Sequence, residues 1–120
     1  MLLFDHRVAA HVLWFFAGPP RRAGMAYIYA KHEIEDYDTW ERHHEANADE
    51  RAAHGSLGSQ AFRPADGSDT VVVLQEVADD RLDEALAYYD SETFEETLEA
   101  AGVRSVVASE VLERVHEQDA

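Results

Sequence analysis

The chain has 120 residues and a mass of 13.5 kDa, enough for one domain with a hydrophobic core and too little for two. Its 25 acidic and 10 basic residues give a formal net charge of -15, which argues against nucleic-acid and membrane-surface partners. There is no cysteine, so disulfides and thiolate chemistry are excluded.

The acidic excess fits either ordinary solubility or adaptation to concentrated salt. Lys31 is the only lysine in the chain. At molar salt the Debye length falls to about 3 Å, which screens the self-repulsion of a compact acidic protein. We therefore expect a halophilic protein, located in the cytoplasm.

The first 24 residues differ from the rest. They hold a single acid, Asp5, and an apolar stretch over residues 8–18 that is too short to span a bilayer. That stretch also lacks the basic start and the cleavage site of a signal peptide. Because Met25 stands immediately before the first predicted strand, we expect residues 1–24 to be a poorly packed N-terminal extension and residues 25–120 to form the domain.

From Met25 onwards, periodicity and turn residues predict the order strand, helix, strand, strand, helix, strand. Asp36 or Asp38 offers an N-cap for the first helix, and Asp79 or Asp80 for the second. The predicted elements are a strand over 26–33, a helix over 37–54, strands over 57–63 and 70–77, a helix that restarts at Ser91 and ends before Gly102, and a strand from 103 to about 115.

This order predicts an α+β fold of the ferredoxin-like βαββαβ type, with an antiparallel sheet and helices on one face. Two strands are apolar on both sides, so one layer of helices cannot cover them. We expect a second copy of the chain to cover the other face, giving a homodimer. The predicted sides hold Val71, Val73, Val107 and Val111 on one face, and Val72, Leu74, Val106 and Leu112 on the other.

The first helix carries the most functional information. At 100° per residue, the side turned to the sheet holds Tyr37, Trp40, His44, Asn47, Ala48 and Arg51. Burying such polar groups costs several kcal/mol unless each finds a partner, so a wet or ligand-filled pocket is one interpretation. The other is a structural ion pair between Arg51 and a sheet carboxylate, Glu76 or Glu110.

Metal and nucleotide chemistry find no support. His43 and His44 diverge by about 100° on a helix, and His54 lies roughly 16 Å from His43, so no pair can chelate. We find neither a glycine-rich phosphate loop nor a nucleophile elbow. On the second helix, Tyr89 is predicted to point inward and Tyr88 to be turned away by 100°.

Four short motifs resemble the dimeric α+β barrel superfamily, near small antibiotic biosynthesis monooxygenase-like and cyclase-like proteins. The resemblance covers about residues 26–116. The motifs are Asp36-Tyr37-x-x-Trp40, Arg51-x-x-x-Gly55, Phe62-Arg63-x-x-Asp66 and Ala100-Ala101-Gly102-Val103. It implies a pocket between helices and sheet in each subunit, and a partner subunit on the other sheet face.

The resemblance also implies a cofactor-independent monooxygenase or cyclase that acts on an aromatic or polyketide-like small molecule, with no cofactor and no metal. His44 would accept a proton near its unperturbed pKa, and Arg51 would stabilise developing negative charge. The expected catalytic residues are His44, Arg51 and Asn47, and the expected ligand-binding residues are Trp40, Tyr37, Tyr89 and Tyr29. A non-catalytic dimeric ligand-binding or stress-response protein is the alternative.

Overall fold

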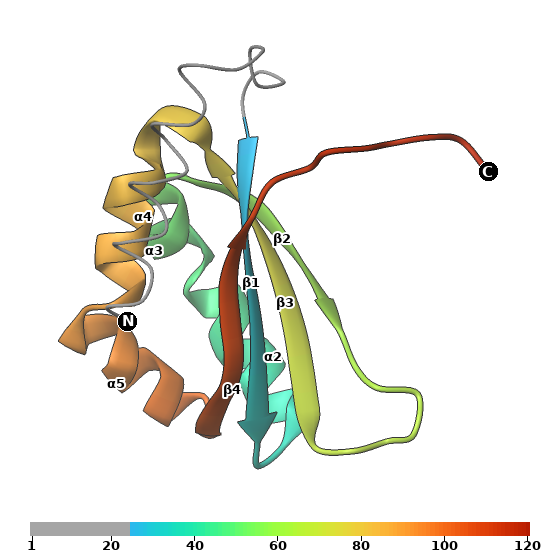
Figure 1. The fold of residues 1–120 in the computed structure, drawn as a ribbon. Coiled ribbons are helices and arrows are strands. Elements are labelled where there is room, and N and C mark those ends of the chain that lie inside the picture. The colour runs from blue at the N-terminus through green and yellow to red at the C-terminus, as the bar shows by residue number, and fades with distance from the viewer. Residues whose placement is uncertain (1–24) are drawn as a thin grey trace.

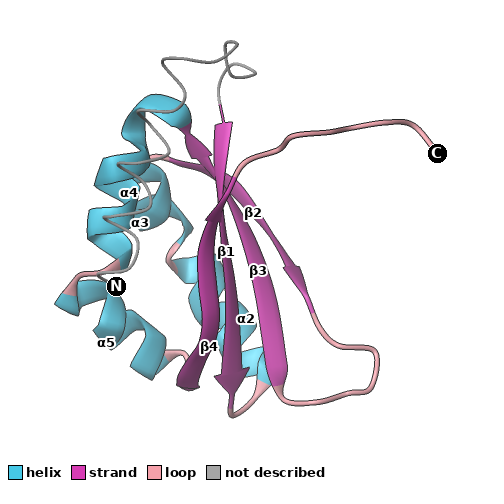
Figure 2. Cartoon of the chain, in the orientation of Figure 1, coloured by secondary structure: helices cyan, strands magenta, loops and turns pink. Residues whose placement is uncertain are grey.

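The structure, a computed structural model, describes residues 25–120. The predicted N-terminal extension lies outside the described residues. Four antiparallel strands form one sheet in the order β2-β3-β1-β4, and the described helices lie on one of its faces, which is the predicted ferredoxin-like arrangement (Figures 1 and 2). The elements are β1 (Met25–Ile34), α2 (Tyr37–Ala46), α3 (Ala48–Ala53), β2 (Ser56–Phe62), β3 (Thr70–Ala78), η1 (Asp79–Arg81), α4 (Leu82–Tyr89), α5 (Glu92–Ala100) and β4 (Val103–Leu112).

The single helix predicted over residues 37–54 is in fact two helices that meet at Asn47. Asp36 caps α2, since its carboxylate accepts the Thr39 N–H at 2.9 Å. At the break, the His44 carbonyl accepts the Asn47 N–H at 3.3 Å and the Arg51 Nη1 at 2.8 Å. No glycine or proline marks this break, so helical periodicity could not predict it.

The predicted cap of the second helical segment is wrong. Asp79 and Asp80 lie in the 3-10 turn η1, and neither provides a side-chain cap to α4. The restart at Ser91 is confirmed, because its hydroxyl accepts the Phe94 N–H at 3.2 Å. Gly102 ends the segment with φ +80°, a conformation that favours glycine. Within residues 25–120 no helix is long and apolar enough to cross a membrane.

The last strand also differs from the prediction. It ends at Leu112 rather than near Val115. Its pairing with β1 shifts register between Lys31 and His32, so Val106 lies opposite His32 and Val107 is left over. The predicted side of Val106 is therefore wrong, because Val106 lines the cavity on the helix side of the sheet. A simple alternation cannot anticipate a bulge.

The core lies between the sheet and the helices, in two apolar clusters. Both draw on alternate residues of β1 and β3, as the period of a strand requires. One cluster contains Ala26, Ile28, Val77, Leu82 and Ala85, and the other contains Ile34, Trp40, Val71, Val73 and Ala101.

The opposite side of the sheet, here called the open face, has no described helix over it (Figure 1). Phe62 is 53% exposed and Leu112 36%. Tyr27 is the exception: Arg114, just after β4, donates to its hydroxyl and lies over its ring. By their pairing, the open face holds Tyr29, Lys31, Phe62, Val72, Leu74 and Leu112.

Candidate functional site

A cavity of about 310 Å³ lies between the helices and the sheet. This volume is at the lower end of the range for small-molecule sites. Its sheet side is formed by Ile28, Ala30, His32, Val73, Gln75 and Val106, and its helix side includes Trp40, His44, Asn47, Arg51, Tyr89 and Phe94. The helix face that carries polar and aromatic residues instead of aliphatic ones therefore lines this cavity.

Arg51 is the strongest feature of the cavity. Its side chain lines the space and is only 7% exposed. Nη1 donates to the His44 carbonyl at 2.8 Å, and among residues 25–120 the guanidinium makes no ion pair. The predicted alternative of a pair with Glu76 or Glu110 is not found. Both carboxylates belong to the other side of the sheet, where they pair in register with Tyr27 and Tyr29.

His44 is a neutral imidazole in this site. Burial, together with the nearby charges of Arg51 and His32, lowers its pKa to about 4. One ring nitrogen, Nε2, shares a hydrogen bond of 2.9 Å with the Ser59 hydroxyl of β2. The expectation of a pKa near the unperturbed value is corrected: His44 is uncharged at neutral pH but is a weaker base than a free histidine.

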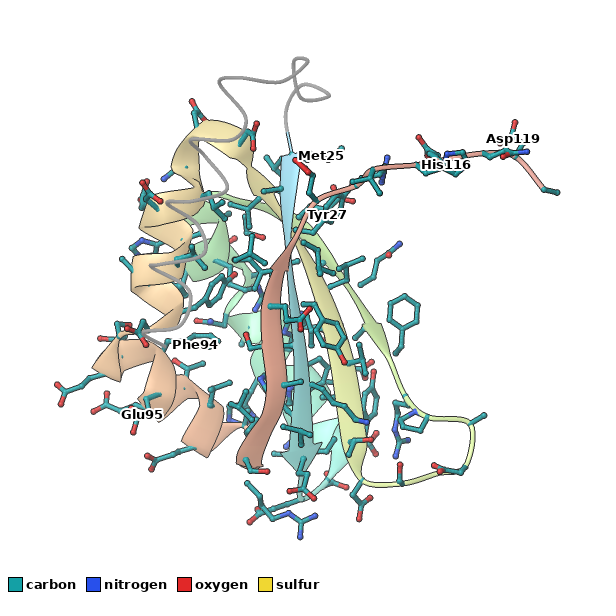
Figure 3. All side chains as sticks on the ribbon, in the orientation of Figure 1. Met25, Tyr27, Phe94, Glu95, His116 and Asp119 are labelled. Carbon is teal, nitrogen blue, oxygen red and sulfur yellow. The ribbon has the colours of Figure 1, made fainter. Side chains whose placement is uncertain are left out.

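Aromatic rings form much of the helix side. Trp40 is buried and stacks on the His44 ring, with centroids 4.6 Å apart and an interplanar angle of 14°. Tyr89 meets Phe94 edge to face at 4.9 Å. Phe94 points from α5 towards the space between helices and sheet (Figure 3). Such surfaces favour a flat, aromatic ligand.

Asn47 links the α2–α3 break to α4. Its Nδ2 donates to the Tyr88 hydroxyl at 3.0 Å, so this amide group holds α4 against the α2–α3 break. Tyr88 is packed in the core, since it is only 6% exposed and its ring stacks on His54 at 4.3 Å. Burial raises the pKa of Tyr89 to about 12, so its hydroxyl stays neutral beside the cavity.

Two predicted ligand-binding residues do not line the cavity. Tyr29 lies on the open face, in register with Leu74 and Glu110. Tyr37 packs beside Trp40, but its hydroxyl donates to Glu41 at 2.9 Å and Arg63 lies 4.7 Å over its ring. It belongs to the helix start, near the β2–β3 loop.

Sequence reasoning missed two polar residues on the sheet side. His32 of β1 and Gln75 of β3 are 7% and 5% exposed, and both line the cavity. The Ser56 hydroxyl donates to the Gln75 Oε1 at 2.9 Å. The available signal was a polar residue at an inward position of a strand whose other inward positions are apolar, as in Val71, Val73 and Val77.

In the described part of the chain, no three histidine, aspartate or glutamate side chains converge as a metal site. The basic and carboxylate groups that line the cavity are one guanidinium, the three imidazoles of His32, His43 and His44, and the carboxylates of Asp90 and Glu95. Such a set can hold an oxygen-bearing organic ligand, because it offers a positive charge, N–H donors and ring lone pairs.

No protein-family profile matches this sequence, and no curated protein matches it. Solved structures do. A proposed antibiotic biosynthesis monooxygenase from Bordetella bronchiseptica aligns with a TM-score of 0.63 and 12% identity, over 78% of this chain and 99% of its own. One from Caulobacter crescentus gives 0.58 and 19%, over 78% and 92%.

SnoaB from Streptomyces nogalater, a cofactor-independent oxygenase, aligns with a TM-score of 0.54 and 14% identity, over 82% of this chain and 97% of its own. At such identities the likeness concerns the fold. The motif-based prediction is confirmed at that level: this chain has an α+β fold similar to that of these antibiotic biosynthesis monooxygenase-like structures.

Proposed function

We propose that this chain is a cofactor-independent monooxygenase or cyclase that acts on a small aromatic or polyketide-like molecule in the cavity. The observation that carries the proposal is that Arg51 is buried and makes no ion pair among the described residues. A buried guanidinium bonded only to a backbone carbonyl, among described residues, has N–H groups left for a ligand oxygen. Aromatic rings line the same cavity, as do the carboxylates of Asp90 and Glu95, but among the described residues Arg51 forms no ion pair with either, so an anionic ligand atom is the partner that would stabilise it most.

Direct oxygenation requires an electron-rich carbon next to such an oxygen. An anthrone, for example, loses a proton to become an enolate, and the enolate carbon then reacts with oxygen. The CH₂ group becomes a carbonyl, one oxygen atom enters the product and the other leaves as water. The substrate supplies the electrons, so no external reductant takes part.

His44 would accept the proton and Arg51 would hold the enolate oxygen. In the empty cavity the pKa of His44 is about 4. A bound enolate would raise that pKa, because an opposite charge nearby favours the imidazolium. Proton transfer and charge stabilisation by Arg51 would then depend on the same bound anion.

A homodimer formed through the open face belongs to this proposal. The open face exposes Phe62 and Leu112, and carries Val72 and Leu74 as half-buried neighbours. A contiguous apolar sheet surface of this kind marks an interaction site. A second copy seated there would close the two sheets into a barrel and leave each cavity on the outside of the sheets.

The weak basicity of His44 favours a second candidate, a non-catalytic dimeric ligand-binding or stress-response protein. In that case the same residues bind a small molecule without turnover. Oxygen uptake over a panel of anthrones and hydroquinones separates the two. We expect consumption above the spontaneous rate with no added flavin, haem or metal.

Arg51→Ala should lower that rate at least tenfold, with Arg42→Ala as the matched control, because Arg42 is exposed on the solvent side of α2. Loss of the hydrogen bond to His44 should cost about 1–3 kcal/mol of unfolding free energy. His44→Ala, Asn47→Ala and Trp40→Phe extend the series. If no substrate is consumed, or if these variants match the wild type, the oxygenase proposal fails and the binding protein takes its place.

A further inference from the structure

His32 occupies the centre of the sheet on its cavity side. It belongs to β1, an interior strand, between Val71 of β3 and Val106 of β4. His32 is only 7% exposed, yet it is one of the residues that line the cavity. Helix residues approach a ligand from one side, and His32 approaches it from the other.

The ring of His32 has an unusual polar atom. Nδ1 is buried and has no hydrogen-bond partner, and it is the only such side-chain nitrogen or oxygen in the described part of the chain. Burial lowers the pKa of His32, so the ring is neutral and carries one N–H and one lone pair. An N–H left without an acceptor is rarer in proteins than an acceptor left without a donor. The proton therefore belongs on Nε2, and Nε2 is the nitrogen left to meet the cavity.

We propose that His32 is a ligand-binding residue whose Nε2–H donates a hydrogen bond to a phenolic or enolic oxygen of an aromatic ligand. His44, on the helix side, supplies the complementary acceptor. Both residues line the same cavity, one from the sheet and one from the helix side. A hydroxyl can accept from one imidazole and donate to the other, and after ionisation the oxygen keeps the donor.

This inference rests on the cavity being the substrate site proposed above, but it does not require oxygenation. It names the group that is recognised: a hydroxyl or its oxyanion on an aromatic ring system. The oxygen-free hydrocarbon of the same shape should gain nothing from His32. A binding experiment with 1-naphthol and naphthalene as probes makes that comparison.

The first measurement uses the wild-type protein without any probe. Long-range ¹H–¹⁵N correlation spectra of histidine-labelled protein at pH 7 report the tautomer of each ring. We expect the pattern of a neutral Nε2–H imidazole for His32. A neutral Nδ1–H ring, or a doubly protonated ring, would overturn the inference whatever the protein does with oxygen.

The second measurement compares variants by probe affinity. His32→Gln places an amide N–H near the position of Nε2, whereas His32→Asn places one near Nδ1 and His32→Leu has neither. We expect 1-naphthol to shift the His32 Nε2 resonance in the wild type. The Kd of 1-naphthol should rise about tenfold or more in His32→Leu and His32→Asn, and about threefold or less in His32→Gln. The Kd of naphthalene should be the same in all four proteins.

Equal naphthol affinity in wild type and His32→Leu, or no naphthol binding to the wild type at all, contradicts the inference. The two proposals remain separable. If naphthol contacts His32 as described but no anthrone or hydroquinone consumes oxygen, the oxygenase proposal fails and His32 keeps its role. If oxygen is consumed while the tautomer is Nδ1–H, His32 loses its role and the oxygenase proposal stands.

Discussion

The two faces of the sheet differ in how far their side chains are buried. On the helix side, β3 presents Val71, Val73 and Val77, each no more than 5% exposed, and the polar Gln75 between them. On the open face the same strand presents Val72, Leu74 and Glu76, all half-buried. β3 thus faces the packed core and its cavity on one side, and a largely apolar surface without a described helix over it on the other.

This contrast shows that apolar residues alone do not identify a functional side. On the helix side, His32 and Gln75 of the sheet and Arg51 of α3 line a cavity. The open face carries the charged residues Lys31, Glu76 and Glu110 beside its apolar ones. The proposed site and the proposed dimer interface therefore lie on opposite faces of one four-stranded sheet.

Neighbouring residues on β3 give the sharpest test of this difference. Val73→Asp would bury an unpaired charge in the core, which costs several kcal/mol, so we expect loss of the cooperative fold. Leu74→Asp, one residue later, would keep the fold and dissociate the proposed dimer. Circular dichroism reports the fold, and light scattering at micromolar concentration reports the mass.

The control is Asp38→Asn, a change on the solvent side of α2 that should leave both fold and mass unchanged. A wild-type protein that is monomeric in dilute and in molar salt would contradict the barrel. A dimer that persists in Leu74→Asp would show that the open face is not the interface.

Acidification tests the helix side by itself. The unfolded chain protonates its histidines near pH 6.5, whereas burial lowers the pKa of His32 and brings that of His44 to about 4. Between these values the unfolded state binds more protons, so stability falls as pH drops from 6.5 to 4 and is unaffected above that window. We expect a loss of about 1–2 kcal/mol from His44, after allowance for its partial exposure.

Urea unfolding midpoints at pH 7 and pH 4.5 measure this effect. His44→Gln removes one titrating group and should reduce the loss, while His116→Gln, in the exposed C-terminal segment, should not. The same loss in wild type and His44→Gln would show that His44 is not a buried neutral group.

Salt should produce the smallest change and act mainly on the outer surface of the helices. Exposed carboxylates line α5 at Glu92, Glu95, Glu96 and Glu99. Screening their repulsion between 0.1 and 2 M KCl should raise the Tm by a few degrees, equivalent to about 1 kcal/mol. Replacing Glu95, Glu96 and Glu99 with Gln should flatten that dependence. A Tm that is indifferent to KCl would remove the prediction of a halophilic protein.

Local pattern was sufficient for the order of elements. The alternation of a strand puts His32 with Ile28 on one side of β1 and Tyr29 on the other, as the pairing shows, and Asp36, one of the two predicted caps, begins α2. These features depend on the geometry of single elements, whose periods of 2 and 3.6 residues are written directly in the sequence. Helical spacing likewise placed Trp40, His44, Asn47 and Arg51 on one side, and all four line the cavity.

Tertiary structure decided the remaining features, because each depends on a partner that is distant in sequence. The bulge opposite His32 arises from the pairing of β4 with β1, and it turns Val106 to the cavity. Asn47, at the helix break, bonds to Tyr88, 41 residues away, and thereby links that break to α4. The low pKa of His44 follows from burial against the sheet, which no spacing along a helix can reveal. Sequence alone determined which residues could form a polar cavity, whereas only the packed fold determined which of them are charged, bonded or left without a partner.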